Sequence, residues 1–472
     1  MKLGKAAGPD GVPVEAWKVL GNCGVNWLTQ FFNRVTVEGK MPDDLRNSII
    51  VPIFKQKGDE SDYSNYRGIK LISHTMKVYE RLVDSRLREM VTIFQERWGF
   101  MPERSTTDAI FIARQMMEKY REKRKPCYLA FLDLEKAYDR LARAVIWNAL
   151  RGRGVLERLI SVIKDMYEGS KAAVRTPHGM TKKMDITVGV HQGSDLSPFL
   201  FVLTLDCIVN HLEECSLRTI LYADDIALVA DSREELEEKV QLWQGALADN
   251  GLRLNVKKTK FVSSEQCTEP ILDCHGEMIE KVEEFRYLGS DLSEEGSVDQ
   301  AVRGRINAAW LKWRESTGIL CSNPLRPTLK GKLYRTVVRP ALLYGCECWA
   351  LGRAQERQLH AAELMLRWAC GWTRQDRVRN EDVRTVMKTV PIQLKMREQR
   401  LRWYGHILRR QEDHPTKLAL APGKRPRGAP RKRWRDVIKR DLAEIGAAPD
   451  DALDRMRWRQ ITKAADPATA LD

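Results

Sequence analysis

The sequence predicts a mixed α/β (α+β) fold for this chain of 472 residues. Two short apolar runs rich in β-forming residues, 129–133 (LAFLD) and 219–230 (TILYADDIALVA), indicate strands that carry aspartates. Residues 74–90 and 106–120 have helical spacing, and beyond about residue 300 the pattern is helical with few strand signals. Hydrophobic residues make up 43% of the chain, which supports a large core and excludes global disorder.

The N-terminal third combines turns, strands and helices. The GPDG sequence at residues 8–11 marks a turn, and residues 49–54 (IIVPIF) indicate a strand interrupted by Pro52. Helical spacing returns at about residues 143–150 and 155–168. These segments predict helices packed around short strands.

The aspartate pair Asp224-Asp225 separates two apolar runs, so we expect a hairpin with both carboxylates at its turn. A helix is expected at about 233–249, because Ser232 and Glu235 form a capping box just before an apolar stripe. The two segments that follow, LRLNV and KFVSS, are expected to be strands.

Positive charge is concentrated in the C-terminal third. The chain has a formal net charge of +15, yet residues 301–440 alone hold 33 Lys and Arg against 11 Asp and Glu, so the remainder is net acidic. Eight of the 13 tryptophans lie between Trp310 and Trp458. A basic stretch interleaved with aromatic residues is typical of nucleic-acid binding. The alternative is a solvated basic face above core tryptophans.

Cysteine usage and hydropathy argue against several protein classes. Ten scattered cysteines in a long chain predict free thiols with no disulfide partner. Cys346, Cys348, His360 and Cys370 invite a zinc hypothesis, but their spacing fits no short zinc module. The longest apolar run, FLFVLTL, stops at Asp206 and is too short for a membrane span. No apolar stretch follows the first lysines, so we expect an intracellular, non-secreted protein in the nucleus and/or cytoplasm.

Three aspartates beside apolar segments are the strongest chemical signal. Residues 129–133 indicate a buried strand that would deliver Asp133 at its edge, and the hairpin would deliver Asp224 and Asp225. Clustered carboxylates are costly unless cations neutralise them. Mg²⁺ takes carboxylate and phosphate oxygens, and two such ions can hold both reacting oxygens of a phosphoryl transfer. An Asp-Asp pair alone is more often a polar turn, so the surrounding motifs decide.

Those surrounding motifs resemble the reverse transcriptases of non-LTR (long interspersed, RTE-like) retrotransposons. LYADDIALVA resembles their YxDD signature, FLDLEKAYDRL the preceding acidic motif, and VGVHQGSDLSPFLF the block between the two. Upstream, GPDGVPVEAWK and NYRGIKLISHTMKVYERL match motifs of the fingers, and downstream NVKKTKFV and FRYLGSDLS match the next two blocks. The C-terminal pieces LYGCECW, LRWYGHILRR and GKRPRGAPRKRW extend the resemblance over nearly the whole chain.

The resemblance implies a right-hand polymerase with a small antiparallel palm sheet backed by helices. It also implies RNA-directed DNA synthesis, with an RNA template, a DNA primer and dNTP as partners and two Mg²⁺ ions, or Mn²⁺, as cofactors. The expected divisions are fingers with part of the palm over 1–125, palm with a primer-grip-like hairpin over 126–295, a helical thumb-like region over 296–415, and a basic C-terminal extension over 416–472.

Site residues carry over from the matching motifs. Asp133 and Asp224 would be shared metal ligands and catalytic acids, with Asp225 a weaker or outer acid that completes the set. Tyr138, five residues after Asp133, would clash with a ribose 2′-OH and so select deoxynucleotides. The other residues implied to bind dNTP are Arg67, Lys55, Gln192, Gly193 and Lys258. The residues implied to bind primer are Tyr222, Phe285, Tyr287, Leu288 and Gly289. The basic residues implied to bind nucleic acid are Lys424, Arg425, Arg427, Arg431, Lys432, Arg433 and Arg435.

Several of these assignments have plainer alternatives. Lys55 can be an ordinary surface lysine, and the hairpin aromatics can simply pack against the sheet. Trp403 and Trp434 can stack on bases, but helix packing is the better interpretation. His406 is similarly better interpreted as a structural histidine than as a ligand.

Two departures from the family pattern keep rival functions open. The resemblance starts inside the first fingers block, so we expect truncated fingers and no N-terminal endonuclease. Asp195 stands in QGSDLSP where a small or apolar residue is usual, and its charge would weaken triphosphate binding. The alternative function is therefore a catalytically inactive, truncated, polymerase-like nucleic-acid-binding remnant. An RNA-templated RNA polymerase shares the aspartate pattern, but Tyr138 argues against it. The oligomeric state stays unknown.

Overall fold

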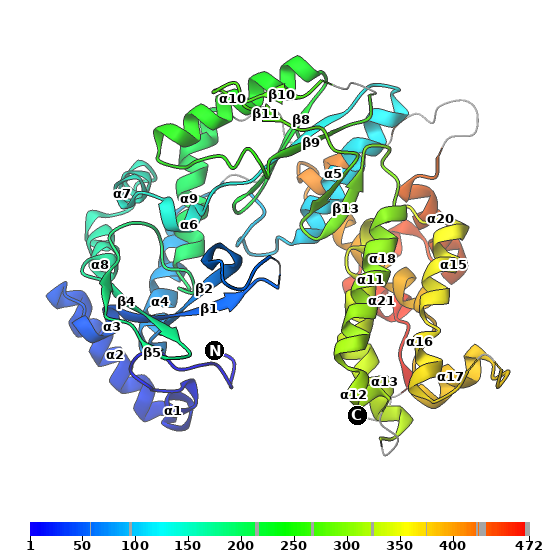
Figure 1. The fold of residues 1–472 in the computed structure, drawn as a ribbon, viewed down its shortest axis with the longest axis horizontal. Helices are drawn as coiled ribbons and strands as arrows, with labels where there is room; N and C mark the ends of the chain where they lie inside the picture. The colour runs from blue at the N-terminus through cyan, green and yellow to red at the C-terminus, as the bar shows by residue number, and fades with distance from the viewer. Residues whose placement is uncertain are drawn as a thin grey trace.

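The computed structural model of this chain describes residues 1–56, 58–93, 97–212, 217–265, 269–321, 325–373, 375–421, 423 and 431–467. In Figure 1 the N-terminal elements lie on one side, the helices from α11 onward lie on the other, and strands β8 and β9 lie near the top between them. The mixed α/β class predicted from the sequence is confirmed, since small antiparallel sheets are surrounded by helices.

A four-stranded antiparallel sheet is the centre of the fold. Its order is β7-β8-β3-β9, with β7 at Thr219–Tyr222, β8 at Asp225–Ala230, β3 at Tyr128–Leu132 and β9 at Lys260–Ser263. All five residues of β3 are buried. A strand covered on both faces is apolar throughout, which explains the uninterrupted LAFL sequence.

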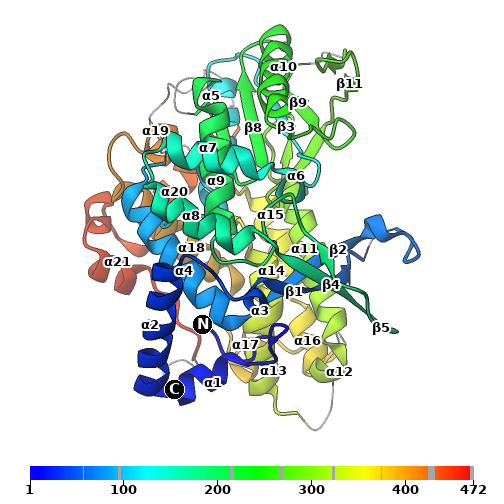
Figure 2. The ribbon, with the colours of Figure 1, turned by 90° about the vertical axis from the view of Figure 1, so that its left-hand side faces the viewer.

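Alternate residues of β3 enter two different cores. Tyr128, Ala130 and Leu132 join the larger core, whereas Leu129 and Phe131 join a second core on the opposite face. The larger core is built with α9 (Ser197–Val209) and α10 (Arg233–Asp249), and the second with α5 (Thr106–Glu122) and C-terminal helices. In Figure 2, α10 lies beside strands β8, β3 and β9.

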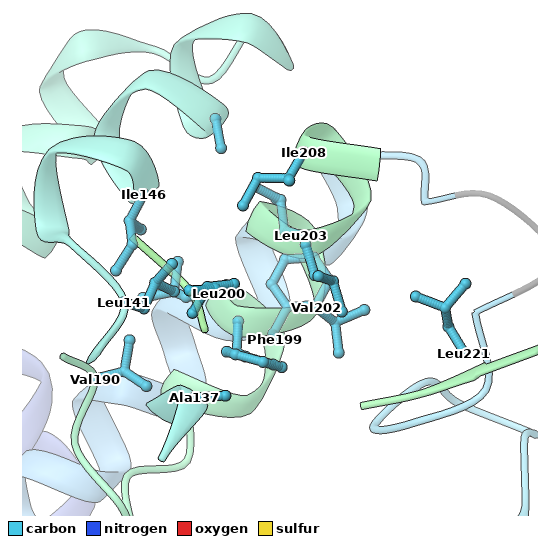
Figure 3. Close-up of a cluster of buried hydrophobic side chains, with 14 of the residues drawn as sticks. Ala137, Leu141, Ile146, Val190, Phe199, Leu200, Val202, Leu203, Ile208 and Leu221 are labelled. Carbon is cyan, nitrogen blue, oxygen red and sulfur yellow. The ribbon is translucent and has the colours of Figure 1, made fainter. Parts of the chain in front are cut away.

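Helix α9 explains the longest apolar run of the sequence. It is buried on nearly all sides, so it is hydrophobic all round rather than amphipathic. Figure 3 shows Leu200 of this helix beside Leu141 and Ile146, and α9 packs against α7 (Arg143–Gly152). A core helix, and not a membrane span, accounts for the run, and no helix among the described residues is long and apolar enough to cross a bilayer.

A second sheet lies toward the N-terminal side. Strand β1 (Asn47–Phe54) pairs antiparallel with β2 (Tyr66–Ile72) and parallel with β4 (Lys171–Thr176). The predicted interruption at Pro52 is wrong, because the strand continues through Pro52 opposite Gly68. The smaller strands of this sheet are β5 (Gly179–Met180) and β6 (Met184–Asp185). The nearby helices and 3₁₀ turns are α1 (Val14–Val19), α2 (Gly21–Glu38), α3 (Asp43–Arg46), η1 (Tyr63–Asn65), α4 (His74–Met90), α6 (Ala137–Arg140), α8 (Glu157–Tyr167) and η2 (Asn210–Leu212).

Two hairpins follow the central sheet. Strands β12 (Glu284–Tyr287) and β13 (Ser290–Ser293) pair around a two-residue turn, and β10 (Ile271–Leu272) pairs with β11 (Met278–Ile279). Leu288 and Gly289 form the first of these turns with φ of 46° and 80°. Positive φ at both central residues is the geometry of a tight hairpin turn and favours Gly at the second position.

The C-terminal region is helical, as predicted. It has a core of its own, and its later helices share the second core with the central sheet. Its elements are α11 (Asp299–Glu315), α12 (Thr317–Leu320), α13 (Pro327–Leu333), η3 (Tyr334–Val338), α14 (Arg339–Leu343), η4 (Cys346–Cys348), α15 (Arg353–Ala362), α16 (Met365–Ala369), α17 (Asn380–Met387), α18 (Ile392–Leu408), α19 (Pro415–Ala419), α20 (Trp434–Ile445), η5 (Pro449–Ala452) and α21 (Arg455–Thr462).

Local predictions around the aspartate pair are mostly confirmed. The helix at 233–249 is α10, and Ser232 accepts the backbone N–H of Glu235. The second bond of a capping box, from the Ser232 N–H to the Glu235 carboxylate, was predicted wrongly. The Glu235 carboxylate instead accepts from Asp231 N and pairs with Arg218. LRLNV is also not a strand: it makes one isolated bridge through Leu254.

Candidate active site

Three aspartates come together at one end of the central sheet. Leu132 of β3 lies opposite Ile226 of β8, so the register continues to Asp133 opposite Asp225. Asp224 occupies the two-residue turn between Tyr222 and Asp225, with Ala223 at a φ of 56°. The antiparallel pairing therefore brings together carboxylates that lie about ninety positions apart in the sequence.

The electrostatics of the three carboxylates reflect their proximity. Burial, followed by the Asp224 and Asp133 carboxylates, raises the pKa of Asp225 to about 6. Burial also raises the pKa of Asp224, and Asp133 adds to that increase while Arg67 opposes it. The site therefore holds more negative charge than its surroundings neutralise.

The carboxylates of this site are suitable ligands for a divalent cation, but they do not form a complete metal-binding site by themselves. Among the residues that the structure describes, no group of three His, Cys, Asp or Glu side chains is arranged so that it could hold a metal ion. Mg²⁺ ordinarily takes one or two carboxylates together with water and phosphate oxygens. Asp133 and Asp224 offer two carboxylates of that kind. A cation already stands beside them, since Lys258 Nζ lies 3.5 Å from Asp133 Oδ2.

The N-terminal sheet contributes one cation to this site. Arg67 lies on β2 and is exposed, and its charge lowers the pKa of the Asp224 carboxyl. Lys55 directly follows β1, two residues beyond Ile53, which pairs with Arg67, and its Nζ donates to the Ser64 carbonyl at 2.9 Å. The structure thus brings Arg67 to the carboxylates and gives Lys55 a contact within its own loop.

Tyr138 is placed beside the carboxylates by α6. Its ring stacks on Phe201 at 4.5 Å with an interplanar angle of 15°. Burial raises the pKa of Tyr138, and Asp224 raises it further, so the phenol is close enough to feel that charge. The phenol oxygen is buried and has no hydrogen-bond partner among the described residues.

Gln192 and Gly193 contact α6 and β2, respectively. Gln192 Nε2 donates to both carboxylate oxygens of Asp139, at 3.2 and 3.3 Å. Gly193 has a φ of 105°, and a Cβ there would lie 2.5 Å from the Lys70 carbonyl oxygen. Burial lowers the pKa of Lys70 to about 8, with Arg143 adding to the effect and Asp139 opposing it. Sequence reasoning gave no role to Lys70 and Asp139, although both lie inside the quoted motifs NYRGIKLISHTMKVYERL and FLDLEKAYDRL.

The β12–β13 hairpin lies against the same sheet. Phe285 stacks on Phe131 at 4.3 Å, and Tyr287 is buried. Burial raises the pKa of Tyr287, and Asp225 and Tyr222 add to it. The side chains of Phe285 and Tyr287 thus pack as the plainer alternative expected, and the turn residues Leu288 and Gly289 are half-buried.

The turn of that hairpin is held from the C-terminal region. The Leu288 carbonyl accepts the Tyr344 hydroxyl at 2.9 Å, and the Gly289 carbonyl accepts from Arg305. Tyr222 is half-buried at the end of β7, and burial raises its pKa, with Tyr344 next in effect. Segments far apart in the sequence therefore fix the turn beside the aspartates.

Asp195 is neutralised locally. Its carboxylate pairs with Arg81, and its backbone N–H donates to Glu80 at 2.9 Å. The repulsion expected from the sequence is weakened, because the Arg81 guanidinium offsets the charge.

Gly99 is a further site residue that sequence reasoning missed. The Trp98 N–H donates to the Leu221 carbonyl at 2.8 Å, so this segment runs along the edge of β7. A Cβ on Gly99 would lie 2.3 Å from the Ala223 nitrogen, in the turn that carries Asp224. Contacts that close do not occur in folded proteins, so only glycine fits. A glycine between two aromatic residues, Trp98 and Phe100, was the available signal.

The predicted basic nucleic-acid residues fall into two groups. Lys424, Arg425 and Arg427 lie outside the described residues. Arg431 pairs with Glu295, and Arg433 pairs with Glu122 and Asp436. The remaining two, Lys432 and Arg435, are half-buried.

The structure also bears on the base-stacking hypothesis and on the zinc hypothesis for the C-terminal region. Trp434 and Trp403 are 0% and 8% exposed and pack with Phe111, so they are core residues and the base-stacking hypothesis is wrong. The zinc hypothesis finds no ligand group among the described residues, and His360 is hydrogen-bonded to Asn380 and Gln393. The eight cysteines that the structure describes are free thiols.

The chain matches known proteins over most of its length. The family model "Reverse transcriptase (RNA-dependent DNA polymerase)" matches residues 55–292, just over half of the chain. The "RNA-directed DNA polymerase from mobile element jockey" of Drosophila funebris is 26% identical over 96% of this chain and 51% of its own length. A type-1 R2 retrotransposable-element polyprotein of Nasonia vitripennis is 26% identical over 54% of this chain and 25% of its own length. The chain spans about half or less of these relatives.

A solved structure is also similar. A telomerase from Candida albicans, described in complex with a fragment of telomeric RNA, has a TM-score of 0.44 and 12% identity. The match covers 79% of this chain and 69% of that one.

Proposed function

The chain belongs to the reverse transcriptase (RNA-dependent DNA polymerase) family, and we propose that it catalyses RNA-directed DNA synthesis for a non-LTR retrotransposon. One observation carries the proposal: Asp133 and the Asp224-Asp225 pair lie at the same end of the central sheet. Arg67 of the other sheet is close enough for its positive charge to lower the pKa of Asp224. Carboxylates and a guanidinium at one place are what phosphoryl transfer from a triphosphate requires.

In the proposed reaction the 3′-hydroxyl of a DNA primer attacks the α-phosphorus of a dNTP paired with an RNA template. A P–O bond forms, the bond between the α-phosphorus and the bridging oxygen breaks, the hydroxyl loses its proton and pyrophosphate leaves. Reverse transcriptases generally use divalent metal ions, and two Mg²⁺ or Mn²⁺ ions held by Asp133 and Asp224 would supply charge stabilisation for the phosphate oxygens. Asp225 would complete the negative field from an outer position.

The cationic residues take the triphosphate in this proposal. Arg67 offers a planar fork of donors for phosphate oxygens, and Lys55 remains a prediction for the same role. Lys258 would leave Asp133 when a stronger cation binds there and would then protonate the departing pyrophosphate. Tyr138 would exclude a 2′-hydroxyl, and Gln192 with Gly193 would contact the incoming base pair.

The primer would be held by the β7–β8 hairpin and the β12–β13 hairpin. Tyr222 and the turn residues Leu288 and Gly289 offer the contacts, while Phe285 and Tyr287 support the turn from below. The basic residues Lys424, Arg425, Arg427, Arg431, Lys432, Arg433 and Arg435 remain predicted contacts to template or hybrid.

We propose the same four divisions of the chain, with one addition. The pairing of β1 with β4 adds residues 171–185 to the sheet of the proposed fingers. The RTE-like assignment stays a prediction. So does a location in the nucleus and/or cytoplasm, where dNTP and template would be available.

Primer extension on an RNA template tests the proposal. We expect Mg²⁺-dependent extension by the parent chain and a loss of roughly 10²-fold or more in Asp224→Asn, because one charge-stabilising group is removed. Asp249→Asn, an exposed carboxamide substitution at the end of α10, serves as the matched control and should extend like the parent. Extension that survives Asp224→Asn would contradict the proposed chemistry.

A second candidate function is a nucleic-acid-binding remnant without catalysis. It is favoured by Lys258, whose Nζ lies 3.5 Å from Asp133 Oδ2, where it competes with a metal ion for that carboxylate. It predicts RNA binding without extension in either Mg²⁺ or Mn²⁺. Ribonucleotide incorporation in the same assay would instead favour an RNA-templated RNA polymerase.

A further inference from the structure

A basic hollow lies between α18, α21 and the start of α5, and it shares no lining residue with the carboxylate site. Its volume is about 480 Å³. Four arginines line it, Arg402, Arg409, Arg455 and Arg459, and among the described lining residues Glu347 is the one acid. The lining therefore carries a net positive charge.

Two of these arginines are available for a ligand. Arg455 and Arg459 are exposed on α21, and no acidic side chain among the described residues lies within 4.0 Å of either. Arg457, on the same helix, does not line the hollow and pairs with Asp451 at 2.9 Å. Arg402 has a weaker neighbour, since Glu398 Oε1 lies 3.9 Å away.

The positive charge of the lining also acts on His406, one of the lining residues. Burial, followed by the charges of Arg410, Arg409 and Arg455 and opposed by Glu103, lowers the pKa of His406 to about 4.

We propose that this hollow binds the phosphodiester backbone of a single-stranded nucleic acid as that strand enters or leaves the polymerase site. Guanidinium groups bind phosphate oxygens through paired N–H donors, and several arginines around one hollow can hold successive phosphates. The side-chain amide of Gln399 adds a neutral donor on the wall. The inference rests on the proposed function, because a polymerase must guide the strand beyond the reacting pair.

The hollow is within reach of the catalytic turn. Gly99 packs against Ala223 of that turn, and Ser105 lines the hollow only six residues later. Six residues of fully extended chain span at most ~20 Å, so a strand of a few nucleotides bridges the two places.

Salt-dependent binding of the full chain tests this inference. The double variant Arg455→Gln/Arg459→Gln is compared with Arg34→Gln/Arg457→Gln, which removes equal charge from two arginines that already have acidic partners. Fluorescence anisotropy with a labelled single-stranded RNA measures Kd at several KCl concentrations, from roughly 50 to 300 mM. Over this range the affinity due to phosphate contacts falls as the salt concentration rises. Thermal unfolding midpoints check that both variants fold.

We expect the hollow variant to bind about tenfold more weakly at fixed salt, with a salt slope shallower by about 1.4 for two lost phosphate contacts. Equal binding by the hollow and control variants would overturn the inference. A DNA strand of the same sequence forms a second arm: equal losses on both strands indicate backbone recognition, and a loss on one assigns the hollow to that strand.

Extension of a short preannealed primer separates this inference from the proposed function. With a template that extends only one unpaired nucleotide beyond the primer, the hollow variant should extend that primer like the parent at saturating duplex, because no single strand is then long enough to bridge from the reacting pair to the hollow. If the parent itself fails to extend while the binding contrast persists, the proposed function fails and the hollow is still a nucleic-acid site.

Discussion

At the residue scale, Asp225 shows the stability cost of clustering carboxylates at the proposed catalytic site. Its neighbours Asp224 and Asp133 raise its pKa, after burial, to about 6. A carboxyl in the unfolded chain releases its proton near pH 4. Between these values the folded chain binds more protons than the unfolded chain, so stability falls as the pH rises through this window and the full cost is present above about pH 6.

We therefore expect Asp225→Asn to unfold at a higher temperature than the parent at pH 7, by about 2 °C, because the neutral amide removes the repulsion. The difference should shrink as the pH falls below 6 and disappear near pH 4. Thermal unfolding without divalent metal at several pH values measures it, with Asp249→Asn as a control that stays close to the parent. An offset independent of pH would contradict this electrostatic account.

Tyr138 is the residue for which sugar selection can be tested. Its ring is fixed by stacking on Phe201, and its hydroxyl has no hydrogen-bond partner among the described residues. The ring, and not the hydroxyl, should therefore exclude a ribose. We expect Tyr138→Ala to raise ribonucleotide incorporation relative to deoxynucleotide incorporation by about tenfold or more, whereas Tyr138→Phe keeps the parent ratio. Equal ratios in all three proteins, measured by single-nucleotide extension, would remove this role.

At the scale of elements, the turn between β7 and β8 depends on a segment outside its own hairpin. Gly99 lies against Ala223, and the Trp98 N–H holds the Leu221 carbonyl. The hairpin fixes Asp224 in the turn and Asp225 at the start of β8, and the segment with Trp98 and Gly99 fixes the position of the turn. The position of Asp224 therefore has two independent supports.

Gly99→Ala should move that turn. A Cβ at 2.3 Å from a backbone nitrogen forces a displacement, and a misplacement of about 1 Å can cost ~10²-fold in rate. Gly245→Ala, in the middle of α10 with nothing within 4 Å of its Cβ, should instead add about 0.5–1 kcal/mol of stability and leave the rate unchanged. Primer extension and urea unfolding of both variants distinguish local displacement from general destabilisation. A parental rate in Gly99→Ala would exclude this support.

At the scale of the whole molecule, the C-terminal helices complete the core of the central sheet. Trp434 is fully buried, its ring meets Phe111 of α5 at 4.8 Å, and its Nε1 donates to the Glu347 carbonyl at 2.7 Å. One face of the sheet would lose its cover without α18, α20 and α21. The basic C-terminal third is thus structural as well as charged.

Trp434→Ala should destabilise the chain by about 3–5 kcal/mol, because it leaves a large cavity and an unpaired carbonyl. Trp368→Ala, at a side chain that is 58% exposed, should cost much less. Urea unfolding measures both, and RNA binding of the folded Trp434→Ala protein should match the parent. Weaker RNA binding at unchanged stability would restore the base-stacking hypothesis.

Much of the candidate site was predictable because its signals are local. The hairpin that carries Asp224 and Asp225, the helix α10 after it and the buried strand before Asp133 follow from short-range apolar patterns and turn residues. The second sheet was only partly predictable, since the pairing of β1 with β4 joins residues more than a hundred positions apart and leaves no periodic trace. For the same reason the pattern could not reveal that LRLNV lacks a strand partner.

The sequence by itself determined the chemical groups of this protein: three carboxylates beside apolar strands, a tyrosine after the first of them and a basic C-terminal third. Only the tertiary structure decided which cations meet those carboxylates. It brings Lys258 and Arg67 to them, ties Lys55 to its own loop, pairs Asp195 with Arg81 and places Gly99 under the turn. The reason is physical: residue type and spacing specify local conformation, whereas the distance between charged groups depends on strand register and packing between remote segments.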